Sequence, residues 1–369
     1  MTMKKAPDPL SRLMVIDRLE VGPVAIEPKK LRMPYVVTTR GNTEATELSY
    51  TYDEAVFEPD EIESLNLASM IGAQVAFNYG LFCKEIRFRG AFDAHDRRFI
   101  EEMTRNTARE IYVNKLLMPN AFLVDDAKDI PAIKLSDYLK ARITFDDNAA
   151  RKLKLRPWVT NRKRHTVLSS GGKDSLLTQG LLSELGYETH PIFLNESGRH
   201  WYTALNAYRH FKDHVPNTAR VWTNADRLFS WMLKRIPLIR ADYAKRRSDS
   251  YPIRLWTVAV FLFGALPIMR RRGVGRLCIG DEFDSTVRAT FKSIPHYAGY
   301  YDQSRYFDNA MSRYFRRKKW NLSQFSLLRT MSELLIEKVL VERYPGLQEH
   351  QVSCHDNHIV DDRTRPFGR

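Results

Sequence analysis

The sequence predicts an α/β protein in which a parallel-sheet domain follows an N-terminal α+β domain. Between residues 161 and 295, short apolar strands alternate with amphipathic helices, which is typical of a parallel sheet with helical crossovers. Before them, residues 15–57 carry β-branched and aromatic runs, and helical spacing of apolar residues begins at Asp60. We therefore predict an α+β domain at 1–150, a parallel α/β domain at 161–295 and a helical C-terminal segment at 296–369 that completes the site.

The N-terminal elements follow from the spacing of apolar residues. Strands are predicted within residues 15–57, where apolar runs are separated by the turn signals Pro-Lys-Lys and Arg-Gly-Asn. Helices are predicted at 62–82 and 96–117, because apolar residues recur there every three or four positions. The polar, basic stretch 146–165 is then expected to connect the two domains.

The central domain alternates strands and helices, so the carboxyl ends of its strands should meet at one edge of the sheet. The predicted elements are a strand at 166–168, a helix at 175–185 ended by Gly186, a strand at 190–194, a helix at 255–269 and a strand at 276–280.

Composition and length exclude several classes of protein. The apolar run 255–269 has 15 residues, whereas a membrane span needs roughly 20, and it contains Pro267. We predict a buried core helix capped by Gly273, and no membrane partner. The three cysteines (Cys83, Cys278 and Cys354) are too few for a disulfide framework, and no apolar leader follows the basic N-terminus, so a cytoplasmic location is expected.

Net charge favours an anionic partner. The chain has 58 basic and 44 acidic residues, which gives +14 at pH 7. Nucleic acid, nucleotides and phosphorylated substrates are all consistent with this excess. No nucleic-acid-binding module accompanies the basic clusters, so charge alone does not select among these partners.

The segment that carries chemistry is Ser169-Ser170-Gly171-Gly172-Lys173-Asp174-Ser175, directly between a predicted strand and a predicted helix. Its glycines let the backbone approach an anion, and the helix N-terminus offers N–H groups with a positive dipole end. Its serines can donate hydrogen bonds to phosphate oxygens, and Lys173 supplies a positive charge. Because a bare phosphate repels Asp174, we expect Mg²⁺ to bridge this carboxylate and the phosphates.

The same segment resembles the SGGxDS signature of the PP-loop (N-type) ATP pyrophosphatase superfamily, position by position over Ser170–Ser175. The usual P-loop and the dinucleotide fingerprint are absent. The resemblance covers residues 161–295 and implies an adenine nucleotide alpha hydrolase-like domain. It implies ATP and Mg²⁺ as cofactors, cleavage between the α- and β-phosphates, and adenylation of a substrate oxygen with release of AMP and pyrophosphate.

Two further polar segments follow predicted strands at the same sheet edge. Asn195 and Glu196 are candidates for binding the adenosine part of ATP, and Asp281 and Glu282 are candidates for binding metal or substrate. A surface loop or a helix cap accounts equally well for each of these residues.

A third cluster lies near the C-terminus, at Ser353–His358. Cys354 and His358 have spacing suited to a shared metal, and some N-type relatives, including deazaguanine synthases, extend such a cysteine into a zinc site. Phe367 stands where the next cysteine of that pattern would be. The alternative is a substrate-contacting turn, with Arg363 and Arg365 near an anionic group.

The whole arrangement resembles the ATP-dependent UDP-N-acetylmuramoyl-L-alanyl-L-glutamate epimerases of peptidoglycan precursor synthesis. This resemblance implies an isomerase that adenylates the terminal L-Glu carboxylate of an acidic, UDP-linked muramoyl dipeptide, after which a base inverts the α-carbon. Candidates for the base are Cys354, His355, His358, Asp281 and Glu282, beside the catalytic Asp174 and Lys173 of the loop.

Two alternatives come from other classes. The first is a tRNA- or nucleobase-modifying PP-loop enzyme that transfers nitrogen or sulfur to an adenylated position; the basic clusters favour it, and the lack of any C-x-x-C pair disfavours the sulfur version. The second is a non-catalytic nucleotide-binding protein, which Asp174 disfavours because a carboxylate beside phosphates implies Mg²⁺. The sequence leaves the oligomeric state open.

Overall fold

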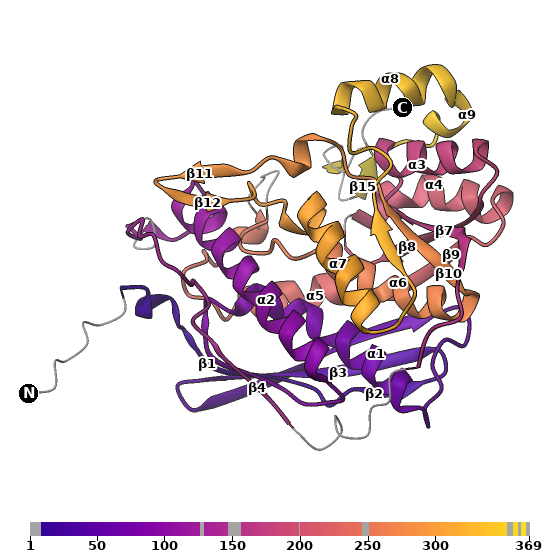
Figure 1. The fold of residues 1–369 in the computed structure, drawn as a ribbon. Coiled ribbons are helices and arrows are strands. Elements are labelled where there is room, and N and C mark those ends of the chain that lie inside the picture. The colour runs from indigo at the N-terminus through magenta and orange to yellow at the C-terminus, as the bar shows by residue number, and fades with distance from the viewer. Residues whose placement is uncertain are drawn as a thin grey trace, which may run out of the picture.

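The computed structural model describes residues 9–125, 129–146, 156–198, 200–245, 251–352, 357–360 and 363–366, the last two ranges by their backbone alone. Within these residues the fold is α/β, as the sequence predicts: one large sheet is covered by helices (Figure 1).

The central part of the chain forms five parallel strands. They are β7 (Asn161–Ser169), β8 (Glu188–Asn195), β9 (Ala219–Thr223), β10 (Val274–Ile279) and β13 (Ser323–Phe325). Their order across the sheet is β13-β10-β7-β8-β9, and each neighbouring pair is parallel. The helices that connect them are α3 (Lys173–Glu184), α4 (His200–His214), α5 (Ala225–Leu233), α6 (Val258–Arg272) and α7 (Arg305–Arg317).

This strand order creates a topological switch point. From β7 the chain passes through α3 to β8 on one side, and it later returns through α6 to β10 on the other side of β7. The loops that leave β7 and β10 therefore diverge at the carboxyl edge of the sheet. Ligands of open α/β sheets bind in the crevice at such a point.

The N-terminal part forms the rest of the sheet. Its strands are β1 (Ile16–Val21), β2 (Ala25–Glu27), β3 (Lys30–Thr39), β4 (Asn42–Tyr52), β5 (Cys83–Phe88) and β6 (Arg142–Phe145). The first four pair antiparallel, and β5 and β6 continue the sheet in parallel from β1. Its helices are α1 (Ile62–Ala73), which a 3-10 segment extends, and α2 (Ala94–Ile111), which runs into a π-helical turn at Tyr112–Leu117. The strands within 15–57 and both helices confirm the prediction, whereas β5 and β6 were not predicted.

The two parts share one sheet. Strand β4 pairs antiparallel with β9, so Tyr50 faces Thr223 and Tyr52 faces Val221. Next to this pairing, the Ser49 N–H donates to Asn224 Oδ1 at 2.8 Å. Ten strands consequently follow one another without a break among the described residues, and β2 is attached to β3 at the side.

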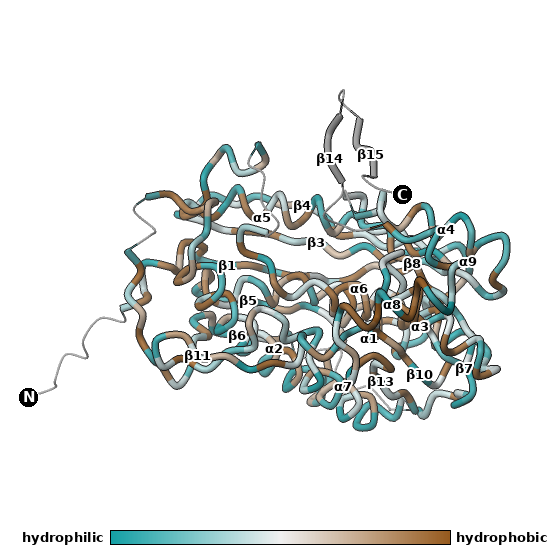
Figure 2. The backbone as a smooth tube through the Cα atoms, turned by 90° about the horizontal axis from the view of Figure 1, so that it is seen from above, coloured by the Kyte–Doolittle hydropathy of each residue, from teal (hydrophilic) through white to brown (hydrophobic). Residues whose placement is uncertain are grey.

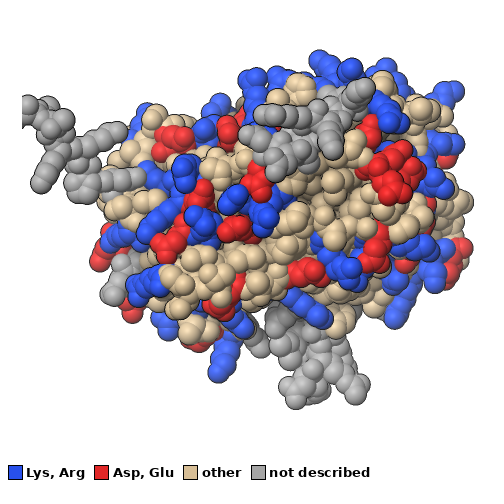
Figure 3. All heavy atoms as spheres, turned by 90° about the horizontal axis from the view of Figure 1, so that it is seen from below, with Lys and Arg blue, Asp and Glu red and all other residues tan. Residues whose placement is uncertain are grey.

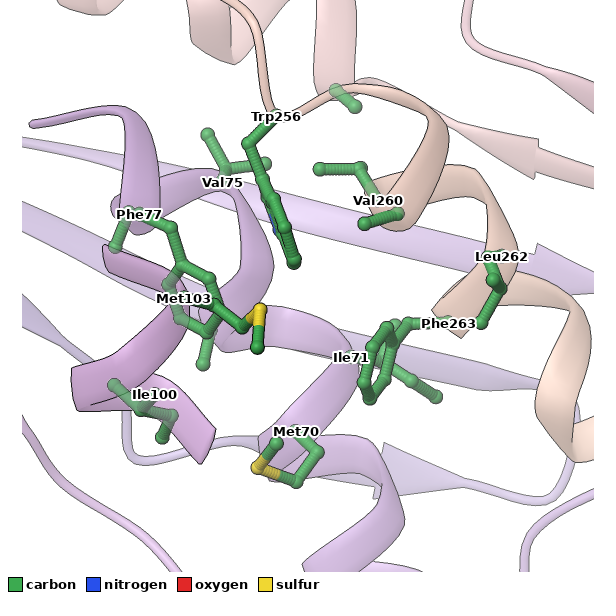
Figure 4. Close-up of a cluster of buried hydrophobic side chains, with 14 of the residues drawn as sticks. Met70, Ile71, Val75, Phe77, Ile100, Met103, Trp256, Val260, Leu262 and Phe263 are labelled. Atoms are coloured by element: carbon green, nitrogen blue, oxygen red, sulfur yellow. The ribbon is translucent and has the colours of Figure 1, made fainter. Parts of the chain in front are cut away.

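The apolar helix predicted at 255–269 is α6, and it lies in the core. Helices α1 and α2 and the segment before α6 direct Met70, Met103 and Trp256 into a common cluster with the side chains of α6 (Figure 4). Gly273 ends the helix at φ +61°, as predicted. Hydrophobic segments, α6 among them, gather inside the molecule, and hydrophilic ones lie mostly outside (Figure 2). In the described part of the chain, no helix has the length and apolar character required to cross a membrane.

A buried polar network joins α2 to α7. The Lys318 side chain is fully buried and donates to Asn66 Oδ1 and Asp96 Oδ2, each at 3.0 Å, and to Asp93. The Tyr314 hydroxyl donates to Asp96 Oδ1 at 2.7 Å. Because Asp93 also caps the N-terminus of α2, the network fixes where this helix begins.

The C-terminal segment returns to the central part. Helices α8 (Glu333–Arg343) and α9 (Pro345–Gln348) lie beside α3 (Figure 1), where Arg343 and Tyr344 both bond to Glu184. The remaining strands pair as two small hairpins, β11 (Ala289–Phe291) with β12 (Ile294–His296), and β14 (Asn357–Val360) with β15 (Arg363–Pro366). The segment after residue 296 is therefore less uniformly helical than predicted, since β13 joins the main sheet.

Candidate functional site

The Ser169–Ser175 loop lies at the switch point, between the end of β7 and the start of α3. Gly280, directly after β10, packs against it: a Cβ at Gly280 would lie 2.8 Å from Asp174 Cβ and 2.8 Å from Asp174 O. The loops after β7 and β10, which the sequence places at the same edge, are thus in contact.

Gly171 and Gly172 allow the backbone of the loop to lie close to α4 and to a bound anion. Gly171 has φ +77°, and a Cβ there would lie 2.9 Å from Thr203 O and 3.0 Å from Ala204 Cα on α4. Gly172 is the N-cap of α3 and provides no side chain to cap it. The first N–H groups of α3 therefore lack the side-chain acceptor that Asp93 supplies to α2, and they can donate to a bound anion.

The three serines have different surroundings. Ser169 and Ser175 are buried, and their hydroxyls bond to each other at 3.3 Å, while the Ser175 hydroxyl donates to Gly172 O at 3.0 Å. Ser170 is exposed. The buried pair stabilises the loop from inside, which leaves Ser170 as the serine whose hydroxyl faces outward.

Asp174 has one engaged and one unengaged carboxylate oxygen. Lys173 Nζ lies 3.2 Å from Asp174 Oδ2 and 3.2 Å from Glu333 Oε1 at the start of α8. Asp174 Oδ1 is buried and has no hydrogen-bond partner. Burial raises the pKa of this carboxyl, and the charge of Lys173 offsets that effect only in part. A desolvated carboxylate oxygen without a partner suits a magnesium ligand, so the residues fit the ion.

Asp281 and Glu282 occupy different surroundings although they are neighbours. Asp281 is buried and pairs with Arg329 at 3.2 Å, and Arg329 also binds Asp308 at 2.6 Å. Glu282 is half-buried: burial raises its pKa, and the nearby charge of Asp174 raises it further. The geometry therefore gives Asp281 a structural ion pair and leaves Glu282 as the carboxylate near Asp174.

Asn195 is the last residue of β8 and Glu196 follows it, beside the end of β7. Asn195 Oδ1 accepts from the Ser197 N–H at 2.9 Å and so shapes the turn. Glu196 is 2% exposed, and its Oε1 has no hydrogen-bond partner. Burial raises the pKa of Glu196 to about 7, so this carboxyl can be protonated or ionised near neutral pH.

The predicted C-terminal residues are only partly placed. Cys354 and His355 lie outside the described residues, and so do the side chains of His358, Arg363 and Arg365 on β14 and β15. Their catalytic and substrate-binding roles stay predictions, and the alternatives of a metal site and a substrate-contacting turn both stay open. Among the described residues, no group of three His, Cys, Asp or Glu side chains could hold a metal ion.

The segment that leads to this cluster does reach the loop. The Val352 N–H donates to Gly171 O at 3.2 Å, and Glu333 approaches Lys173 from α8. Glu333 could not be predicted from the sequence, because nothing local marks a glutamate at a helix start as the partner of a lysine 160 positions earlier.

The sequence analysis also did not identify Arg254 and Lys115 as candidate site residues. Arg254 lies just before α6 and is 7% exposed, and Lys115 lies in the π-helical turn after α2 and is 8% exposed. A π-helical turn often marks a functional position, but its hydrogen-bond pattern has no sequence signature.

A separate cavity of about 400 Å³ is lined by none of the residues of the Ser169–Ser175 loop. It is lined by residues of β7, β10 and β13 and by the end of α3, among them His165, Arg276 and Leu185. The cavity is therefore not part of the switch-point site.

Comparison with known proteins gives short sequence matches. No family model matches the chain. A segment of 60 residues is 39% identical to the 7-cyano-7-deazaguanine synthase of Chlorobium luteolum, and one of 62 residues is 39% identical to that of Chlorobium phaeobacteroides. The matches cover 16% and 17% of this chain and about a quarter of each relative (26% and 27%).

Among solved structures, the U34-tRNA thiolase NcsA from Methanococcus maripaludis, with its 4Fe–4S cluster, is 14% identical to this chain. The match covers 67% of this chain and 66% of that one, with a TM-score of 0.32, which is too low to establish a common fold. The two sequence matches agree with the PP-loop ATP pyrophosphatase superfamily that the Ser169–Ser175 motif indicates. They give no support to the epimerase family.

Proposed function

We propose that this chain binds ATP at the Ser169–Ser175 loop and adenylates an oxygen of a nucleobase-type acceptor, releasing pyrophosphate. The observation that carries the proposal is the pairing of an uncapped helix N-terminus with the unpartnered Oδ1 of Asp174. Together they offer donors for phosphate oxygens and a ligand for Mg²⁺, which is what α,β cleavage of ATP requires.

Each residue of the loop has a distinct part in this proposal. The N–H groups of α3 and the exposed Ser170 hydroxyl bind the leaving pyrophosphate, and the Lys173 ammonium offsets its charge. Asp174, with Glu282 beside it, would hold Mg²⁺. When bound, the ion neutralises charge on the phosphates and orients them. Gly171 keeps the backbone close to the nucleotide because no side chain fits against α4.

The acceptor class comes from the sequence relatives, whose name identifies a cyano-substituted 7-deazaguanine as the product. A nitrile carbon has the oxidation level of a carboxylic acid. Adenylating a carboxylate makes its carbon open to attack by nitrogen, so a carboxylate on a flat heterocycle is the acceptor that this chemistry favours. Cys83 and Cys278 do not favour sulfur transfer, since burial raises the pKa of both thiols.

The test is an assay of α-labelled ATP with Mg²⁺ and one acceptor at a time. The acceptors are 7-deazaguanine bearing a 7-carboxylate, with ammonium present, bulk tRNA, and UDP-N-acetylmuramoyl-L-alanyl-L-glutamate. We expect labelled AMP with the heterocyclic carboxylate. Labelled ADP would refute the PP-loop assignment, and AMP with the muramoyl dipeptide alone would refute the acceptor class.

A tRNA acceptor is the second candidate, and the net charge of +14 favours it. Against it, positive and negative side chains are mixed over the face shown in Figure 3, so the basic excess does not gather there. AMP formation with bulk tRNA, falling steeply as salt rises, would select this candidate over the small heterocycle.

A further inference from the structure

We propose that the free edge of the Arg254 guanidinium is a binding site for an oxyanion, a carboxylate or a phosphate, between the two parts of the chain. The identification of this anion as the acceptor's carboxylate rests on the proposed function, whereas the site itself does not.

The guanidinium is held rigidly and by one edge only. Its Cζ lies 3.6 Å from the ring centroid of Tyr251 and 4.7 Å from that of Phe229. Nη1 donates to Asp226 Oδ1 at 2.8 Å. Nε and Nη2 are buried and have no hydrogen-bond partner. These two nitrogens form the planar pair that binds both oxygens of a carboxylate or phosphate at once.

Leaving two charged donors desolvated is costly, which argues for a ligand that engages them. A buried donor without an acceptor has lost its hydrogen bonds to water without replacing them, and the loss is larger when the donor is charged. The stacking and the Asp226 ion pair fix the guanidinium in place before any ligand arrives. The arrangement is therefore preorganised for an anion, which saves the entropy of ordering a long side chain on binding.

A second cation faces the same region. Asn120 Nδ2 donates to Lys115 O at 2.8 Å and to Pro252 O at 2.9 Å, so the π-helical turn is tied to the segment that carries Arg254. No acidic side chain among the described residues pairs with Lys115. Burial lowers the pKa of Lys115 to about 8, and the positive charge of Arg254 lowers it as well. A bound anion would relieve the repulsion between these two cations.

The position relates this site to the nucleotide loop. Tyr251 contacts the ring of His200 at the start of α4, and the first turn of α4 carries Thr203, whose carbonyl contacts Gly171. Gly198, two residues after Glu196, packs against the carboxyl of Asp226. Glu196, with its unpartnered Oε1, lies close enough to Arg254 that the positive charge of the guanidinium opposes the rise that burial causes in the Glu196 pKa. Its carboxyl can therefore accept from an N–H or O–H group of the same ligand.

The experiment is a calorimetric titration of the full chain with the loop already filled. The protein is saturated with Mg²⁺ and α,β-methylene-ATP, and then titrated with inorganic phosphate or with 7-deazaguanine 7-carboxylate. The variants are Arg254→Met, which removes the charge, and Arg254→Lys, which keeps the charge and loses the paired donors. Arg276→Met is the matched control, since Arg276 also lies over an aromatic ring, Phe325, but lines the separate cavity.

We expect both Arg254 variants to weaken binding of phosphate or the carboxylate by about 10- to 100-fold, with Arg276→Met unchanged. If instead the variants weaken α,β-methylene-ATP by that factor, the site is supported and the anion is a phosphate of ATP. The proposal is overturned if all three Kd values stay within twofold in both variants while circular dichroism shows that they are folded. Failure of the adenylation assay would refute the proposed function and leave this result standing.

Discussion

Replacing Asp174 by asparagine should separate activity from stability. The substitution keeps the shape of the side chain and removes the charge that we assign to Mg²⁺. We expect turnover, measured as labelled AMP, to fall by at least about 100-fold, or roughly 3 kcal/mol in the barrier.

The stability change should be small, for reasons that can be read from the surroundings of Asp174. The ion pair with Lys173 is partly solvated, since the two side chains are 19% and 24% exposed, and such pairs contribute about 1 kcal/mol or less. Against this loss, asparagine removes a carboxylate that burial already disfavours. The two effects oppose each other, so the free energy of unfolding should change by less than about 1 kcal/mol.

Asp308→Asn is the matched control. Its carboxylate accepts from Arg329 at 2.6 Å and from Gln324 at 2.9 Å, and its side chain is only 7% exposed. Removing one partner of a buried pair costs about 3 kcal/mol or more. Urea unfolding followed by circular dichroism measures both variants. Turnover of Asp174→Asn within threefold of the wild type, or a loss of stability as large as in Asp308→Asn, would show that our account of Asp174 is wrong.

Three further changes test other parts of the molecule. Gly171→Ala should weaken α,β-methylene-ATP binding by at least about tenfold, because the new Cβ meets α4. The control is Gly186→Ala, where φ is +72° and a Cβ would have no atom within 4 Å, and it should leave the Kd unchanged. Equal effects of the two substitutions on the Kd would contradict the steric argument. Glu196→Gln should change how the free energy of unfolding depends on pH. The folded protein holds the Glu196 proton more tightly than the unfolded chain does, so the contribution of Glu196 to stability falls as pH rises from 4.5 to about 7. The variant should therefore be more stable than the wild type at pH 8 but not at pH 4.5. Lys318→Met should lose about 3–5 kcal/mol in urea unfolding, against less than about 0.5 kcal/mol for the exposed neighbour in Lys319→Met, and similar midpoints would refute the buried network.

The parts of the fold that the sequence predicted depend on local signals. The strand, the glycine-containing turn and the helix around Ser169–Ser175 follow from residue types within a few positions of one another, and so does the end of α6 at Gly273. The β4–β9 pairing has no such signal, because strand partners are selected by packing between segments far apart in the chain.

The same distinction explains the site. From the sequence, Asp281 and Glu282 are equally good candidates for binding metal or substrate. Successive side chains at the end of a strand point in opposite directions, and only tertiary contacts decide which of the two faces the site. Arg329 engages Asp281, and Asp174 lies near Glu282. Arg254 could not be predicted at all, because its importance rests on the unpartnered Nε and Nη2, which no composition or spacing reveals.

The pairing of β4 with β9 also affects how the chain can fold during synthesis. Ser49 and Asn224 are 175 positions apart, so at typical translation rates roughly ten to thirty seconds pass between the synthesis of β4 and that of β9. Contacts of such long range slow folding and leave a strand edge open to other chains. The first half of β4, which does not pair with β9, carries Thr43, Glu44, Thr46 and Glu47, whose charges and polar groups discourage edge-to-edge aggregation. The acidic start of this strand is therefore expected to limit pairing with other chains while the residues that later pair with β9 are still exposed.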